Sequence, residues 1–250
     1  MRATGLNRPL KQNILRRDIN MAIKLEKKQG IKLTKDVAGV EETLKVVKLG
    51  CGWQASRDGH VMIPQTKTVT KRVGGFFGFG GTVQSEEVTT TERVYVGEID
   101  IDATVFAFRG DRFVGECSYR NKRLSNGGKV VAQSSGDNRR GSTGKQDDET
   151  ITINIENIDT YADTLYLVLN IFNAYNNGQH FNMVNNSYVR VYDDKGVEMA
   201  YFDLAEDYHN MTGVVVGKLH KINGVFEFTA LGDGVRVKGL DEFAKRVKQY

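Results

Sequence analysis

The sequence has few of the residues that build linkers, disulfide frameworks and membrane spans. It contains two prolines and two cysteines, Cys51 and Cys117, in 250 residues. So few cysteines exclude a disulfide-stabilised scaffold and indicate reduced, partly buried thiols of a cytosolic protein. No run approaches the ~18 apolar residues of a transmembrane helix, and the N-terminus has no apolar segment typical of a secretory signal. These absences predict a cytoplasmic globular protein with no transmembrane segment.

Basic residues are in excess only at the beginning of the chain. The formal net charge is +4, and residues 1–20 contain five basic side chains and one acidic side chain. Without this segment the chain has 30 basic and 30 acidic residues. No nucleic acid partner is therefore expected if the chain starts at Met21.

Residues 1–20 have two interpretations. Residues 16–20, RRDIN, could be encoded by AGG AGG GAT ATC AAT, which contains a bacterial ribosome-binding sequence at a suitable distance from Met21. Met21 would then be the true start and residues 1–20 a translated leader. The alternative is a disordered basic tail. Arginine codons of the CGN type would contradict the leader hypothesis.

Strand-length runs recur along most of the chain. They alternate apolar with polar residues or are rich in β-branched residues, and Gly, Asn and Asp separate them. The opening 23–35 predicts two short strands and a turn. Later runs cover 44–53, 91–109, 128–135, 149–158, 164–174, 187–196, 199–207, 212–224 and 225–234. The pattern predicts an all-β fold, an antiparallel β-sandwich, with hairpin turns at 193–196 and 223–224.

Helical patterns are few. Residues 239–250 place Leu240, Phe243 and Val247 on one face, which predicts a short C-terminal helix. A short helical turn is also expected near 41–47.

Residues 57–96 differ from the rest of the chain. Threonine and valine alternate on both sides of GGFFGFGG, residues 74–81, which predicts a long inserted hairpin with a glycine-phenylalanine tip. The tip could contact a partner, another subunit or a membrane surface. Alternatively, its phenylalanines could pack onto the sandwich.

Acidic residues are concentrated in the segment GDNRRGSTGKQDDE, residues 136–149. Carboxylate and amide oxygens on a glycine-punctuated loop are the ligands that Ca²⁺ prefers. The spacing fits neither an EF-hand nor a P-loop. Asp100 and Asp102, in EIDID, share one face of a predicted strand, because side chains at i and i+2 point the same way. A bound cation and a solvated acidic turn, with Arg139, Arg140 and Lys145 as counter-charges, both remain open from these residues.

Several ordered motifs from Met21 onward resemble the TerD-like calcium-binding stress proteins of the tellurite-resistance system. They are IKLEKKQGIKLTK, GCGW, DIDA at 100–103, SGDN with DDE at 135–149, FNMVNNSYVRVYDDKG, MAYFDLAED and FTALGDGVRVKGLDEFAKRV. The resemblance implies a non-enzymatic, calcium-bound β-sandwich that acts in tellurite or stress resistance, with a protein partner in a stress-response complex. The metal ligands it implies are Asp100, Asp102, Asp137, Asn138, Asp147, Asp148 and Glu149.

The sequence departs from the family pattern at two places near these ligands. Gln54 follows the Gly-Trp dipeptide, where the family usually has an acid, and the loop before DDE is basic instead of acidic. One or two calcium ions are therefore expected.

Other chemistries have less support. The four histidines lack HxxxH or HExxH spacing and no CxxC occurs, so zinc is not expected. No nucleophile or glycosidase site can be identified, and we predict that the protein is not an enzyme. The alternative function is a structural or phage-associated binding module that uses the 74–81 hairpin tip.

Overall fold

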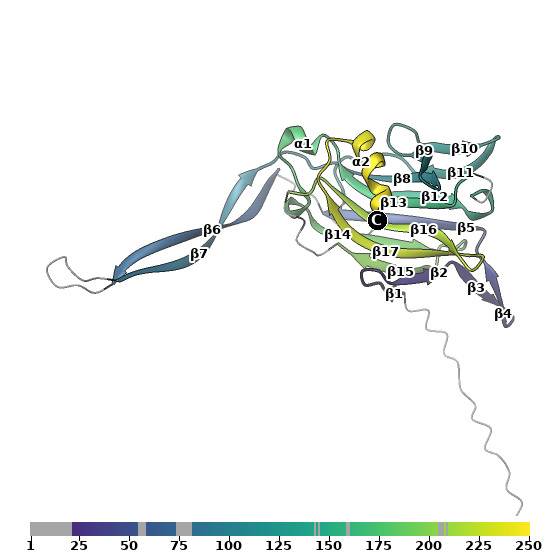
Figure 1. Cartoon of the computed structure of the whole chain (residues 1–250), viewed down its shortest axis with the longest axis horizontal. Coiled ribbons are helices and arrows are strands. Elements are labelled where there is room, and N and C mark those ends of the chain that lie inside the picture. Colours follow the sequence, from purple (N-terminus) through teal and green to yellow (C-terminus); the bar gives the residue numbers. More distant parts are fainter. Residues whose placement is uncertain are drawn as a thin grey trace, which may run out of the picture.

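Two packed β-sheets form the body of the protein (Figure 1). The computed structural model describes residues 22–54, 59–73, 82–142, 144, 146–158, 161–204, 208 and 210–250. The 1–20 segment, the hairpin tip at 74–81 and Lys145 lie outside these residues. The predicted antiparallel β-sandwich is confirmed.

The first sheet has seven strands, and its only parallel pair is β1 with β15. In spatial order the strands are β1 (Ile23–Lys24), β15 (Glu198–Asp203), β14 (Asn185–Tyr192), β5 (Val46–Gln54), β12 (Glu149–Asn154), β11 (Lys129–Ser134) and β10 (Arg123–Asn126).

The second sheet has six antiparallel strands. Their spatial order is β2 (Gly30–Lys32), β17 (Val225–Val235), β16 (Gly213–Ile222), β13 (Thr164–Ile171), β8 (Ile101–Arg109) and β9 (Arg112–Cys117). A small hairpin, β3 (Thr34–Val37) with β4 (Val40–Thr43), stands apart from both sheets.

The main hydrophobic core lies between the two sheets. Ile151 and Ile153 of β12 alternate with half-exposed threonines, so one face of the strand is buried and the other is not. Strand β8 is buried along nearly its whole length, because the second sheet is covered on both faces. Cys51 and Cys117 are free and buried, as expected for reduced thiols.

The C-terminal helix covers part of the outer face of the second sheet. Helix α2 (Leu240–Arg246) continues into the 3₁₀ helix η3 (Val247–Gln249). Leu240, Phe243 and Val247 are buried, which confirms the face predicted from the sequence. The remaining short helices are η1 (Ile155–Asn157), α1 (Ala174–Asn177) and η2 (Phe181–Met183). No helix in the described residues is both long and apolar enough to cross a membrane.

The inserted hairpin projects away from the sandwich (Figure 1). It consists of β6 (His60–Val73) and β7 (Thr82–Tyr95), paired without a register shift from His60↔Tyr95 to Val73↔Thr82. Below we call these two strands the arm. The expected hairpin is confirmed for these strands.

Two local expectations were wrong. The 91–109 run is not continuous, because β7 ends at Tyr95 and β8 begins at Ile101. Gly97, with φ of 73°, lies in the corner where the chain leaves the arm and enters the sandwich. The helical turn near 41–47 is absent, because residues up to Thr43 pair in β4 and Val46 begins β5.

Candidate metal centre

Three carboxylates converge where the two sheets meet. One oxygen from each of Asp100, Asp102 and Asp137 lies within 4.8 Å of the others. Asp102 is on β8, Asp100 lies immediately before that strand, and Asp137 is on the loop between β11 and β12. The structure thus brings together residues that are 35 positions apart. Among the described residues, this is the only group of at least three acidic, histidine or cysteine side chains so arranged.

Glu149 connects the two sheets beside this cluster. It begins β12 and is 3% exposed, and its Oε2 accepts a hydrogen bond of 2.8 Å from the backbone N–H of Ala103 in β8. Its Oε1 accepts one of 3.2 Å from the N–H of Asn138. Glu149 therefore fixes the 135–149 loop against the strand that carries Asp102.

Asn138 and Asp148 hold the shape of the loop. The Asn138 side-chain amide donates to Asp148 Oδ1 at 3.1 Å, and the N–H of Trp53 donates to Asp148 Oδ2 at 2.9 Å. Both Asp148 oxygens are thus used inside the protein. Gly141 is required beside Trp53, since it has φ of 64° and an added Cβ would lie 2.7 Å from the indole nitrogen.

Asp147 lies apart from the other predicted ligands. Its Oδ2 accepts a hydrogen bond of 2.7 Å from the Tyr192 hydroxyl, and its Oδ1 lies 3.5 Å from the Arg190 guanidinium. It packs directly over Gly50, where a Cβ would come within 2.1 Å of its carboxylate. Of the seven predicted ligands, Asp147 is therefore the one bound to side chains of β14 instead of the loop network.

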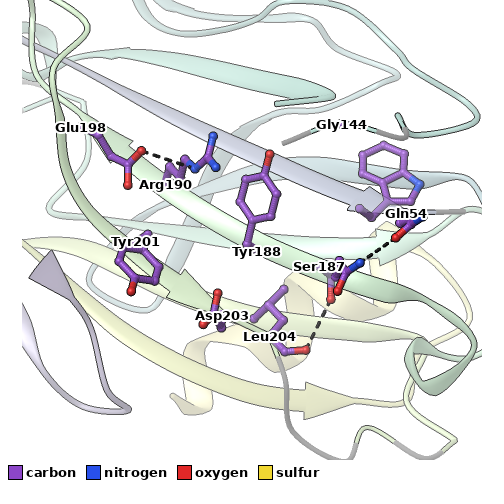
Figure 2. A pocket seen from close by; sticks show the side chains of 11 residues that line it. Gln54, Gly144, Ser187, Tyr188, Arg190, Glu198, Tyr201, Asp203 and Leu204 are labelled. Atoms are coloured by element: carbon purple, nitrogen blue, oxygen red, sulfur yellow. Dashed lines mark hydrogen bonds and ion pairs between the residues drawn. The ribbon is translucent and has the colours of Figure 1, made fainter. Parts of the chain in front are cut away.

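Arg190 belongs to the wall of a hollow of about 780 Å³ on the first sheet. Figure 2 shows Arg190 between Glu198, 3.4 Å away, and the ring of Tyr188, whose centroid is 4.3 Å from the guanidinium carbon. Gln54 lies at the same hollow, and its carbonyl accepts a hydrogen bond of 2.6 Å from Asn186. The residue that replaces the family's usual acid is thus used for a contact between β5 and β14.

The carboxyl groups of the cluster have raised pKa values. Burial, together with the negative charges of Asp100, Glu149 and Asp137, raises the pKa of Asp102 to about 8. Burial raises the pKa of Glu149 to about 7, although the two backbone N–H donors oppose this. Burial and the charge of Asp137 raise the pKa of Asp100 to about 6. The site therefore lacks the positive charge that would stabilise its ionised form.

Of the basic residues of the loop, Arg139 acts to lower the pKa of Asp100, but burial and the charge of Asp137 outweigh it. Arg139 is mostly exposed and its Nε lies 3.4 Å from Asp137, the most exposed acid of the cluster. Arg140 pairs with Glu98 at 3.0 Å. Lys145 lies outside the described residues. Asp100 Oδ1 is buried without a hydrogen-bond partner, so the donor set fits a hard cation bound by oxygen.

Two further polar residues support the centre and were missed from the sequence. Asn170, on β13, pairs with Asp102 across the sheet and donates to its carboxylate at 3.3 Å. Buried Gln179 donates to the carbonyls of Val96 and Glu98, which holds the segment before Asp100. An asparagine inside the apolar run TLYLVLNIF was a usable signal for Asn170. Nothing in the sequence pattern marked Gln179.

The chain is similar to proteins of known families. The model of the TerD domain matches residues 21–247. Stress response protein SCP2 of Bacillus subtilis (strain 168) is 29% identical over 234 residues, which cover 90% of this chain and 99% of that protein. Tellurium resistance protein TerD of Serratia marcescens is 33% identical over 144 residues, which cover 55% of this chain and 72% of that protein.

Solved structures show the same fold. The crystal structure of a homologue of telluride resistance protein (TerD) from Streptomyces coelicolor A3(2) matches 82% of this chain and 97% of its own, with a TM-score of 0.54 and 17% identity. This likeness agrees with the family match along the sequence. The chain belongs to the TerD domain family of tellurium-resistance and stress-response proteins.

Proposed function

We propose that this protein is a non-enzymatic calcium-binding member of its family, in which the ion joins the two sheets at Asp100, Asp102 and Asp137. The observation that carries the proposal is the buried Asp100 oxygen, which has no hydrogen-bond partner and belongs to a cluster of three carboxylates. Ionised carboxylates in this position destabilise the fold unless a proton or a cation neutralises them.

Calcium is the cation that best fits these ligands. All the available donors are oxygens, which excludes the nitrogen and sulfur ligands typical of zinc. Three carboxylate oxygens within 4.8 Å of one another can share one cation, and calcium accepts such an irregular set of protein ligands, whereas magnesium requires a near-ideal octahedron and usually keeps several waters. Backbone oxygens and water would complete the six to eight ligands that calcium takes.

The other predicted ligands have supporting roles in this proposal. Asn138, Asp148 and Glu149 fix the loop through hydrogen bonds to one another and to the backbone. Asp147 is engaged by Tyr192 and Arg190. We therefore propose one ion in place of the one or two expected from the sequence.

The number of ions can be measured by calorimetric titration of the chelator-stripped full chain with Ca²⁺ and, separately, with Mg²⁺. We expect one calcium ion per chain and weaker binding of magnesium. An ion that binds only the folded state adds ~2.7 kcal/mol to the free energy of unfolding at a hundredfold excess over Kd, so the melting temperature should rise. No heat and no melting shift at millimolar calcium would contradict the proposal.

Calcium binding should weaken on acidification. The pKa of Asp102 is about 8, so at pH 6 this carboxyl holds a proton that calcium must displace. The pKa of Glu149 is about 7, so at pH 6 its protonation also removes a negative charge beside the ion. We expect at least a ~10-fold lower affinity at pH 6 than at pH 8. Proton release can be measured near pH 7 as binding heat that depends on the ionisation enthalpy of the buffer. A pH-independent affinity would contradict this.

The stability of the calcium-free protein should change with pH in the opposite direction. In the folded protein the pKa values of Asp100 and Asp102 are raised to about 6 and 8, above the ordinary 3.8 of aspartate. The contribution of these carboxyl groups to the free energy of unfolding is therefore fully present below about pH 4, where they are unionised. That contribution is lost as the pH rises through about 6 and 8. Calcium should restore it, and urea unfolding with and without chelator at pH 5 and pH 8 measures both effects.

The proposed role of the ion is to hold an interaction surface in shape. With calcium bound, the 135–149 loop would be fixed at the junction of the two sheets, available to a protein partner of a cytoplasmic stress-response complex. The alternative module that uses the 74–81 tip depends on residues outside the described part of the chain. The strands of that hairpin are described, and they carry a separate inference.

A further inference from the structure

The arm leaves the sandwich as a two-stranded sheet with neither face packed against the body over most of its length. Its residues from Thr66 to Lys71 and from Thr82 to Arg93 are exposed. The side chains of Val69, Val73, Val83 and Val88 are between 39% and 63% exposed. An isolated two-stranded hairpin is marginally stable in water, and three or more strands are usually needed for a stable sheet. A further strand along one edge would therefore stabilise the arm, and within the described residues β6 and β7 pair only with each other.

The register shows which backbone groups are available at the arm's edges. The N–H of Val96 donates to the Gly59 carbonyl at 2.7 Å, so Gly59–Val96 is a hydrogen-bonded pair. Hydrogen-bonded and non-hydrogen-bonded pairs alternate in an antiparallel ladder. His60↔Tyr95 is therefore a non-hydrogen-bonded pair, as is every second pair after it. The N–H and C=O groups of these residues face outward, away from the other strand.

Three side chains support this assignment. Pro64, which has no N–H, lies at one of the outward positions, where no bond within the arm is lost. The hydroxyls of Thr66 and Thr89, at the next outward pair, lie 3.1 Å apart, as expected where side chains are close. Pro64 also interrupts the β6 edge near the sandwich. The edge that can accept another strand is thus the outer half, residues 66–73.

Charge differs between the two strands of this outer half. Lys67 and Lys71 are on β6, and Glu86 and Glu87 are on β7. None of these four side chains forms an ion pair within the described residues. Two β6 edges brought together would place lysines beside lysines, and two β7 edges would place glutamates beside glutamates. Only a β6 edge against a β7 edge brings opposite charges together.

We propose that the arm binds a second copy of this chain by edge-to-edge strand pairing, β6 of one arm against β7 of the other. The new strand would satisfy outward backbone groups and shield the exposed valines. It would also bring Lys67 and Lys71, which share one face of the arm, next to the strand that carries Glu86 and Glu87, which point to opposite faces, so that one of the two glutamates lies on the face of the lysines. Such a contact uses different surfaces on the two copies. It therefore builds a ring if the rotation closes and a linear assembly if it does not.

The test is sedimentation velocity of the full chain at increasing concentration and at low and high salt. We expect the wild type to form species larger than a monomer, with less association at high salt. Reversal of one edge, in K67E/K71E or in E86K/E87K, should abolish association of each variant alone. An equimolar mixture of the two variants should associate again, because each provides the edge that the other lacks.

The mixture separates contacts between chains from effects inside one arm. Each reversed variant keeps its own like-charged arm after mixing, so an effect on hairpin stability alone would not be rescued. A wild type that stays monomeric at several hundred micromolar, or a mixture that stays monomeric, would overturn the proposal.

The backbone part of the contact has a separate test. Thr68→Pro removes an outward N–H without removing a bond inside the arm, as Pro64 already does four residues earlier. It should abolish association, whereas the control Thr68→Ala should retain it. Equal association of the two variants would show that the β6 edge is not used.

Discussion

Asp102→Asn should remove calcium binding and also make the calcium-free protein more stable. Asp102 is 2% exposed, and burial and three neighbouring acids hold its pKa at about 8. Near pH 8 the wild-type carboxyl is ionised about half of the time without a counter-ion, which destabilises the fold. The asparagine side chain has the shape of aspartate but no charge, so the free-energy cost of burying a charge at this position disappears. It is also a weaker calcium ligand, and we expect at least a ~100-fold loss of affinity.

Asp147→Asn is the matched control for this change. It makes the same substitution in the same acidic segment, but its carboxylate contacts Tyr192 and Arg190 instead of the cluster. Arg190 keeps Glu198 as a partner. Calorimetry should therefore find calcium affinity close to that of the wild type, and thermal melts should show an unchanged calcium-dependent shift. Equal losses in the two variants would show that the ion sits elsewhere in the 136–149 segment.

Phe243→Ala should cause the largest loss of stability among simple truncations of the C-terminal helix. Phe243 is fully buried, its ring centroid lies 6.0 Å from that of Phe106, and it fills the space above Gly213. Removing such a ring from a packed core costs about 3–5 kcal/mol, from lost burial and from the cavity left behind. Urea unfolding should show a lower midpoint for this variant.

The control for the helix is Lys245→Ala, on its exposed face. That substitution should change the free energy of unfolding by less than ~0.5 kcal/mol. Because α2 packs on the outer face of the second sheet, Phe243→Ala should leave calcium affinity nearly unchanged. A small effect of Phe243→Ala would mean that the helix contributes little to the folded state.

Much of the fold could be predicted because its local signals agree with one another. The alternation in residues 149–154 sets which face of β12 is buried, and Asn223-Gly224 forms the tight turn between β16 and β17, with φ of 50° and 87°. Strand order could not be predicted, since the partners of β5 are β12 and β14, about 100 and 140 residues later. Such distant pairings are decided by the packing of whole sheets and leave no mark in a local pattern.

The candidate site could be predicted in part for the same reason. Asp100 and Asp102 are two positions apart, and their carboxylates do meet on one side. Whether the 137–149 loop would reach them depended on how the two sheets pack. Asp147 and Asp148 are adjacent in sequence but have different partners: Asp147 accepts a hydrogen bond from Tyr192, and Asp148 accepts one from the backbone N–H of Trp53. Three consecutive acids therefore could not be assigned to one ion from the sequence.

The contacts at the base of the arm determine how strongly movement of the arm affects the acidic cluster. Each strand has 14 residues, so the arm reaches roughly 45 Å at ~3.3 Å per residue and would act as a long lever on the body. Its two ends enter the sandwich side by side at Gly59 and Val96, and buried Gln179 clamps the outgoing strand through Val96 and Glu98. Asp100 lies two residues beyond that clamp. These two hydrogen bonds tie the segment between the arm and Asp100 to the sandwich, so we expect movement of the arm to be damped before it reaches the acidic cluster.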